Sequence, residues 1–159
     1  MASRWGWIGV LLVMLAAGPG WAHEAARIEQ ACTELVLDYA YYRDRPEGDR
    51  VAELFAVDAE LRVMGQTYLG REAIRARLQD AARGPVFRHL MSTVRIFPEG
   101  PRRATGVSYV TVYSAAAGPL PRALEQPLAV GEYRDIFVLT EAGWKIQRRE
   151  LVPVFAATP

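Results

Sequence analysis

The single internal histidine of the expected mature chain is the clearest candidate for chemistry. The 159-residue sequence holds two histidines, His23 and His89. An imidazole, with an ordinary pKa of about 6.5, can act as a general acid or base near neutral pH. His89 lies in an expected strand over residues 86–97, on the same face as Met91 and Thr93. Two roles remain open for it: acid–base catalysis, or a structural hydrogen bond in a pocket wall.

Three side chains of the first expected helix could act together with His89. Tyr39 and Tyr42 could face a cavity, where a phenol can orient a carbonyl or stabilise an enolate. Their alternative role is to fill the core, with the hydroxyls at its rim. Asp44, at the end of this helix, could be a base, or it could fix the next loop or cap a second helix.

A carboxylate in the middle of a strand is the fourth candidate. Asp135 is flanked on its own face by Tyr133 and Phe137. Burying a carboxylate alone costs several kcal/mol, so it must be paired or protonated. We expect an ion pair with Arg148 or Arg149 of the adjoining strand. A catalytic base with a raised pKa is the alternative.

Several function classes receive no support from the residues. Cys32 is the single cysteine, so no internal disulfide can form, and its apolar neighbours predict a buried, inert thiol. One internal histidine argues against a metal site. The sequence has no glycine-rich phosphate loop and no G-x-S-x-G motif, and we predict no cofactor. The net charge of +1 gives no indication of a nucleic-acid partner.

The first 22 residues have the pattern of a secretory signal peptide. Arg4 precedes a short apolar run over residues 8–17, and small residues allow cleavage after Ala22. An uncleaved anchor is the alternative, although the run is far shorter than the ~20 residues of a membrane span. We therefore expect a mature domain over residues 23–159 that is periplasmic or secreted, with no stable membrane association after cleavage.

The elements that must position the candidates follow from periodicity and from turn residues. Helices are expected over about residues 24–43, 49–55 and 71–82, and strands over 59–64, 86–97 and 103–115. Residues 65–69 are expected to form a short extended loop. A hairpin over 131–155 turns at 141–143, where Gly143 supplies a positive φ. Three helices with one early strand and then a four-strand antiparallel meander predict an α+β fold.

Five motifs in chain order resemble the SnoaL-like branch of the nuclear transport factor 2-like superfamily. They are Y-A-x-x-x-D at 39–44, L-F-A-x-D-A at 54–59, G-R-E-A-I at 70–74, R-H-L at 88–90, and G-x-Y-x-D with G-W-K-I-x-x-R in the hairpin. Thr93 stands where the family usually has Asn. The match covers about residues 26–155, and it is similar also to the small subunits of ring-hydroxylating dioxygenases and to scytalone dehydratase.

The resemblance implies a cone-shaped roll, in which three N-terminal helices pack on a strongly curved, mainly antiparallel sheet that encloses a pocket. It also implies a homodimer through the outer face of the sheet. The second histidine of the scytalone dehydratase branch has no counterpart near Tyr113 and Ser114, and its helix-one carboxylate falls on Tyr41. That catalytic pair is therefore not expected here. The expected pocket residues are Tyr39, Tyr42, Phe55, His89, Met91, Tyr133, Phe137 and Trp144.

Two functions remain from different classes. The first, slightly preferred because the motifs are incomplete, is the binding of a small apolar or aromatic molecule in the pocket. The second is a cofactor-free acid–base enzyme of the dehydratase, isomerase or cyclase type, centred on His89. The enzyme requires His89 and at least one of Tyr39, Asp44 or Asp135 to converge on one cavity.

Overall fold

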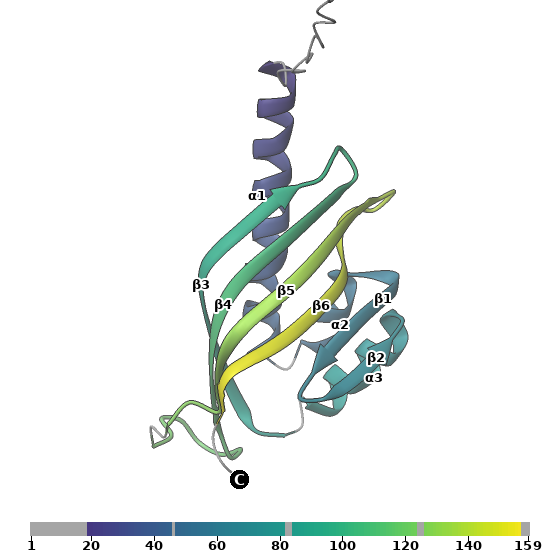
Figure 1. Cartoon of the computed structure of the whole chain (residues 1–159). Helices are drawn as coiled ribbons and strands as arrows, with labels where there is room; N and C mark the ends of the chain where they lie inside the picture. Colours follow the sequence, from purple (N-terminus) through teal and green to yellow (C-terminus); the bar gives the residue numbers. More distant parts are fainter. Residues whose placement is uncertain (1–18, 46, 82–83, 124–125, 157–159) are drawn as a thin grey trace, which may run out of the picture.

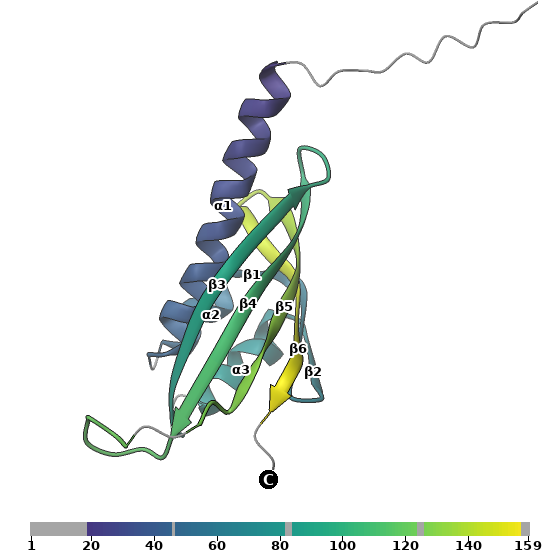
Figure 2. The same cartoon turned by 60° about the vertical axis from the view of Figure 1, so that its left-hand side comes forward.

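The computed structural model describes residues 19–45, 47–81, 84–123 and 126–156. Two helices, two strands and a third helix come first, and four long strands follow. The six strands form one curved sheet in the order β2-β1-β6-β5-β4-β3. The sheet is mixed, since β1 and β6 are parallel and the other four pairings are antiparallel. Figure 1 and Figure 2 show the sheet bending over the helices. The predicted α+β cone is confirmed.

The long helix α1, Pro19–Arg43, runs along the concave side of the sheet, next to β3 (Figure 2). Ile28, Cys32, Val36 and Tyr39 recur at spacings of three and four residues, and all four are buried against the sheet. The helix begins before the predicted cleavage point. Residues 1–18 of the expected signal peptide lie outside the described residues, and residues 19–22 form the first turn of α1. None of the described helices has the length and apolarity to span a membrane.

The segment between α1 and the meander contains one strand more than predicted. Helix α2, Gly48–Glu53, is followed by strand β1, Phe55–Val63. A tight turn then leads to strand β2, Gln66–Leu69, which pairs antiparallel with β1. The segment that forms β2 was expected to be a loop. Met64 and Gly65 both have positive φ, of 51° and 75°, as the two-residue turn of a tight hairpin requires. The sequence Met-Gly does not indicate such a turn, because methionine rarely adopts a positive φ.

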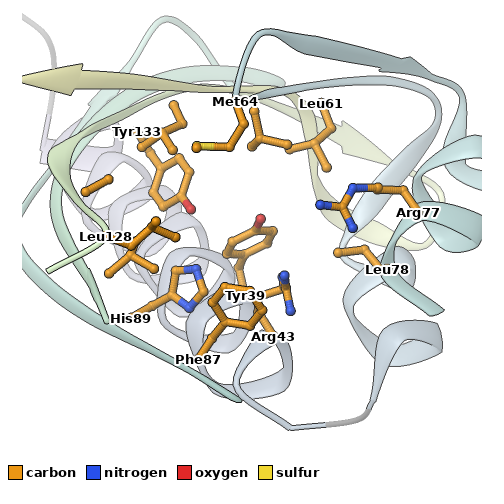
Figure 3. Close-up of a pocket in the computed structure, with 14 residues that line it drawn as sticks. Tyr39, Arg43, Leu61, Met64, Arg77, Leu78, Phe87, His89, Leu128 and Tyr133 are labelled. Carbon is orange, nitrogen blue, oxygen red and sulfur yellow. The ribbon is translucent and has the colours of Figure 1, made fainter. Parts of the chain in front are cut away.

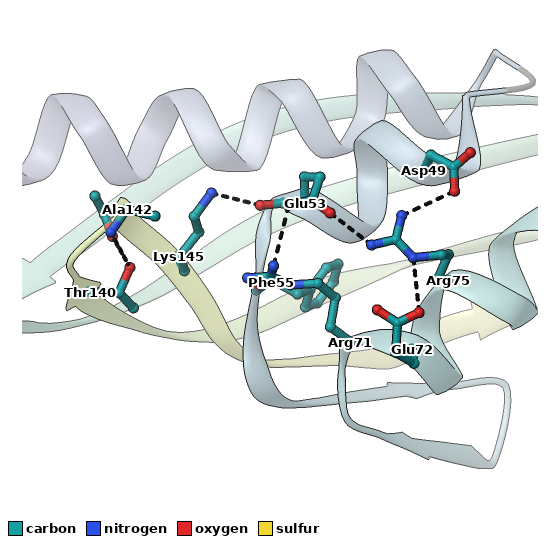
Figure 4. Close-up of polar contacts among 10 residues, drawn as sticks. Asp49, Glu53, Phe55, Arg71, Glu72, Arg75, Thr140, Ala142 and Lys145 are labelled. Atoms are coloured by element: carbon teal, nitrogen blue, oxygen red, sulfur yellow. Dashed lines mark hydrogen bonds and ion pairs between the residues drawn. The ribbon is translucent and has the colours of Figure 1, made fainter.

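Helix α3, Arg71–Ala81, is held against α2 by ion pairs around one arginine. Arg75 contacts carboxylates of Asp49, Glu53 and Glu72 at 3.1, 2.7 and 3.2 Å (Figure 4). Asp49 therefore lies in the first turn of α2 and binds across to α3. The N-cap residue of α2 is Glu47, which forms no side-chain capping hydrogen bond, so the capping role considered for Asp44 is not seen. The predicted last residue of α3, Ala82, lies outside the described residues.

The meander consists of β3, Val86–Pro98, β4, Arg103–Ala115, β5, Ala129–Thr140, and β6, Gly143–Ala156. The prediction of four antiparallel strands is confirmed. Bulges change two of the predicted faces. Thr93 has a φ of 49° within an irregularity between Ser92 and Arg95, so Thr93 is exposed and does not share the inner face of His89. A second bulge, opposite Ile136 and Phe137, turns Arg149 to the inside.

Candidate functional site

A cavity of about 200 Å³ lies at the helix-α3 end of the cone, between the end of α1, the β1 hairpin and the inner face of the meander (Figure 3). Apolar side chains form most of its wall, and the polar groups are two tyrosines, two arginines and one histidine. None of the lining residues is acidic. The lining residues are Tyr39, Arg43, Leu61, Val63, Met64, Arg77, Leu78, Phe87, His89, Val112, Leu128, Ala129, Tyr133 and Leu151.

A histidine–carboxylate pair forms part of this wall. The Nδ1 atom of His89 lies 2.5 Å from Oδ1 of Asp44, and the two side chains are only 6% and 9% exposed. A carboxylate only accepts hydrogen bonds, so Nδ1 carries the proton. The other nitrogen, Nε2, has no hydrogen bond to any residue that the structure describes, and the ring is turned to the cavity (Figure 3). Nε2 is therefore free to accept a proton from a bound molecule.

Backbone contacts hold this pair in place. Oδ2 of Asp44 accepts the backbone N–H of His89 at 2.9 Å, and its backbone carbonyl accepts a hydrogen bond from Arg88 at 3.2 Å. Both Asp44 oxygens are thus engaged by one residue of β3. Asp44 and His89 are 45 residues apart in the chain, and their contact joins the end of α1 to β3.

Two tyrosine hydroxyls point into the cavity beside His89 (Figure 3). The ring of Tyr39 meets the rings of His89 and Tyr133 edge to face, with centroids 6.3 and 5.6 Å apart. Burial, and secondarily the neighbouring Tyr39, raises the pKa of Tyr133 well above its usual value. Tyr133 therefore stays a neutral hydrogen-bond donor at physiological pH, suited to a carbonyl or developing oxyanion.

Asp135 forms an ion pair behind the cavity and does not reach it. Its two oxygens accept hydrogen bonds from Nε and Nη2 of Arg149 at 2.8 and 2.7 Å, and both side chains are buried. The guanidinium lies 4.2 and 4.5 Å from the ring centroids of Tyr39 and Tyr133. The arrangement matches the expected structural ion pair, with Arg149 as the partner. The contacts of the Arg149 guanidinium with these two rings help to hold the tyrosines in position.

The structure thus brings His89, Tyr39, Asp44 and Tyr133 together, and it places five expected pocket residues elsewhere. Phe55 and Phe137 are fully buried in the core, because they pack between α1 and the sheet. Met91 also packs against that core. Tyr42 turns away from the cavity and accepts a hydrogen bond from Arg50. Trp144 lines a different, more open cavity near the start of α1, together with His23.

Sequence reasoning missed the two arginines of the cavity. Arg43 follows Tyr39 by one helical turn, and this spacing could have placed it on the same face. Arg77 precedes the buried Leu78 on an otherwise polar helix, and no sequence signal distinguishes it from the neighbouring arginines of α3. Within the described part of the chain no group of three or more potential ligands could hold a metal ion.

Cys32 takes no part in this site. It is fully buried, and this burial, reinforced by the charge of Asp135, raises the pKa of its thiol to about 12. We expect no reaction of native protein with iodoacetamide at neutral pH, because only the thiolate is nucleophilic. Complete labelling should follow denaturation. Mass spectrometry checks both results, and stoichiometric labelling of the folded protein would contradict the buried position.

Comparisons with known proteins agree with the fold. A proposed scytalone dehydratase from Novosphingobium aromaticivorans has 24% sequence identity and a TM-score of 0.72, with 87% of this chain and 96% of that chain covered. A Mycobacterium tuberculosis protein of unknown function has 26% identity and a TM-score of 0.73, with 87% and 77% covered. The hexachlorocyclohexane dehydrochlorinase LinA-type3 from Novosphingobium barchaimii has 18% identity and a TM-score of 0.72, with 86% and 92% covered.

A search among curated proteins found no match to this sequence. The model of the SnoaL-like domain family matches residues 24–150, which include most of α1, all of α2 and α3, the histidine strand β3 and most of the final hairpin. This match extends over far more than half of the chain and agrees with the motifs and with the cone. The chain therefore belongs to the SnoaL-like domain family, with the nuclear transport factor 2-like fold.

Proposed function

We propose that this protein is a cofactor-free acid–base enzyme that acts on a small, largely apolar molecule, in a reaction of the dehydratase, isomerase or cyclase type. One observation carries the proposal: a histidine in the wall of an apolar cavity has one nitrogen held by a buried carboxylate and the other free. A histidine that served only for a structural hydrogen bond would not need its ring turned to the cavity with the second nitrogen free.

The proposed reaction follows from the positions of the groups. Nε2 of His89 accepts a proton from a carbon of the bound molecule, and Asp44 stabilises the imidazolium that results. The electron pair of the broken C–H bond moves towards an adjacent carbonyl, whose oxygen the Tyr39 or Tyr133 hydroxyl stabilises. Return of the proton to another carbon gives isomerisation, and loss of a neighbouring leaving group gives elimination.

The names of the structural neighbours are compatible with this chemistry. A dehydratase and a dehydrochlorinase share the fold at low sequence identity. Likeness at that level supports the fold alone, so the proposal depends on the geometry of His89 and Asp44 in this chain.

Solvent deuterium exchange tests the proposal without knowledge of the natural substrate. We expect the protein to catalyse exchange of α-protons in small one- and two-ring ketones in heavy water, as measured by proton NMR. His89→Gln should lower this rate by about 10²–10⁴-fold, the usual contribution of a general base. His23→Gln is the matched control and should leave the rate unchanged, because His23 lines the other cavity.

Two outcomes would count against the enzyme. Exchange at equal rates in wild type and His89→Gln would remove the histidine from the mechanism. Ketones that bind without exchanging would leave only the binding of an apolar molecule, the function that the lining itself permits.

We also propose that the mature domain is exported and forms a homodimer. Export rests on the signal-peptide pattern of residues 1–22. The dimer is supported by large apolar side chains on the outer face of β3 and β4, where Leu90, Phe97 and Tyr109 are 56, 50 and 50% exposed. An outer face of this kind is suited to a second copy of the sheet.

A further inference from the structure

Two arginines turn their guanidinium groups towards the cavity, and neither belongs to the His89–Asp44 pair (Figure 3). Arg43 is the last residue of α1, and its Cζ lies 4.5 Å from the ring centroid of Phe87. Arg77 lies on α3, with its Cζ 5.9 Å from the ring centroid of Tyr68. Stacking on an aromatic face positions a guanidinium while leaving its N–H donors available.

These two arginines differ from seven others that the structure describes. Arg62, Arg71, Arg75, Arg103, Arg134, Arg148 and Arg149 each form a close ion pair with Asp or Glu. Arg43 and Arg77 have no ion pair with any carboxylate whose side chain the structure describes. Counted over the side chains that the structure describes, two half-buried cations in the wall of one cavity give that wall a net positive charge.

Two described carboxylates close to this cavity are already paired with other residues. Asp44 is occupied by His89 through both of its oxygens. Asp135 is occupied by Arg149 behind the wall. The cavity is otherwise apolar, so an anion that entered it would meet donors and little competing water. A carboxylate matches the planar fork of arginine, with two parallel hydrogen bonds.

We propose that the ligand of this cavity is a small apolar monocarboxylate, whose acid group binds Arg43 and Arg77 and whose hydrocarbon part lies against Leu61, Leu128 and Tyr133. The inference rests on the proposed function, in that it names the substrate class of the same site. The cavity of about 200 Å³ is smaller than the roughly 300–1,000 Å³ of pockets for drug-sized ligands. A molecule with one ring fits that scale.

The binding of benzoate and of its neutral isostere benzamide to the full mature protein tests this inference. Calorimetric titration at low salt should give a benzoate affinity at least about tenfold above that of benzamide, since a hydrogen bond to a charged group contributes about 1.5–3 kcal/mol. Arg43→Gln and Arg77→Gln should each weaken benzoate binding about tenfold and leave benzamide binding unchanged.

Arg45→Gln provides the matched control. The Cζ atom of Arg45 lies 3.4 Å from the ring centroid of Tyr41, much as Arg43 stacks on Phe87. Arg45 is exposed, however, and does not line the cavity. This variant should bind benzoate as the wild type does. Equal affinity for benzoate and benzamide, no benzoate binding at millimolar concentration, or the same loss in Arg45→Gln would each overturn the proposal.

These results are separable from those of the exchange experiment. His89→Gln should keep its preference for benzoate over benzamide, because the arginines remain in place. Benzoate binding that requires both arginines, in a protein without exchange activity, would support the ligand class and reject the enzyme. Exchange activity without any preference for the anion would support the enzyme and reject the ligand class.

Discussion

Replacing Asp135 with alanine should destabilise the protein by about 3–5 kcal/mol, because it leaves the charge of Arg149 buried without a partner. Arg149 is fully buried and donates two hydrogen bonds to Asp135, while its third nitrogen, Nη1, has no partner. The rings of Tyr39 and Tyr133 cannot replace a carboxylate as acceptors. Since whole domains are stable by about 5–15 kcal/mol, denaturant unfolding should show the loss clearly.

The same strand offers a matched control for this prediction. Glu132 pairs with Arg134 at 2.7 Å, but the arginine is 61% exposed. Glu132→Ala should therefore cost at most about 1 kcal/mol. The double variant Asp135→Leu with Arg149→Met should recover much of the stability lost in Asp135→Ala, because it removes both charges. A cost below about 1 kcal/mol for Asp135→Ala would show that Arg149 is solvated.

Asp44→Asn should nearly abolish proton transfer while keeping the shape of the site. The amide oxygen can still accept the backbone N–H of His89, as Oδ2 does at 2.9 Å. The amide NH₂ then faces Nδ1 and can only donate, which moves the imidazole proton to Nε2. A protonated Nε2 cannot accept a proton from the ligand. We expect an exchange rate about 10²–10⁴-fold below that of wild type.

Nitrogen NMR of the imidazole distinguishes this cause from a collapse of the site. The wild type should show the Nδ1–H tautomer, and Asp44→Asn should show the Nε2–H tautomer in a protein that still binds the ketone. Asp49→Asn removes an exposed carboxylate that pairs with Arg75, and it should change neither property. An unchanged tautomer in Asp44→Asn would mean that Asp44 does not orient His89.

The fold could be predicted because its signals are local. The long strands are rich in apolar and β-branched residues and are bounded by turn residues, and the helix over residues 24–43 carries its apolar residues at helical spacing, so each element has its own pattern. The parallel pairing of β1 with β6 joins segments about 90 residues apart and has no local signature. The bulge at Thr93 had no sequence signal either, because a β-branched residue such as threonine rarely adopts a positive φ.

The site was predicted only in part, because its contacts join segments that are distant in the chain. His89, Tyr39 and Asp44 were singled out by residue type, but their contact depends on how the end of α1 meets β3. Phe55 and Phe137 were expected in the pocket because aromatic residues are typical of both cores and ligand sites. Arg149 and Arg148 were equal candidates to pair with Asp135, until the bulge opposite Ile136 and Phe137 selected Arg149.

Imidazole NMR of the wild-type protein during titration with a small one-ring ligand tests whether His89 faces the bound molecule. The chain has only two histidines, and each lines a different cavity. We expect the ligand to shift the Nε2 resonance of His89, to leave its Nδ1 hydrogen bond to Asp44 intact and not to affect His23. A shift of His23 alone, with His89 unchanged, would place the ligand in the cavity of Trp144 and exclude His89 from the site.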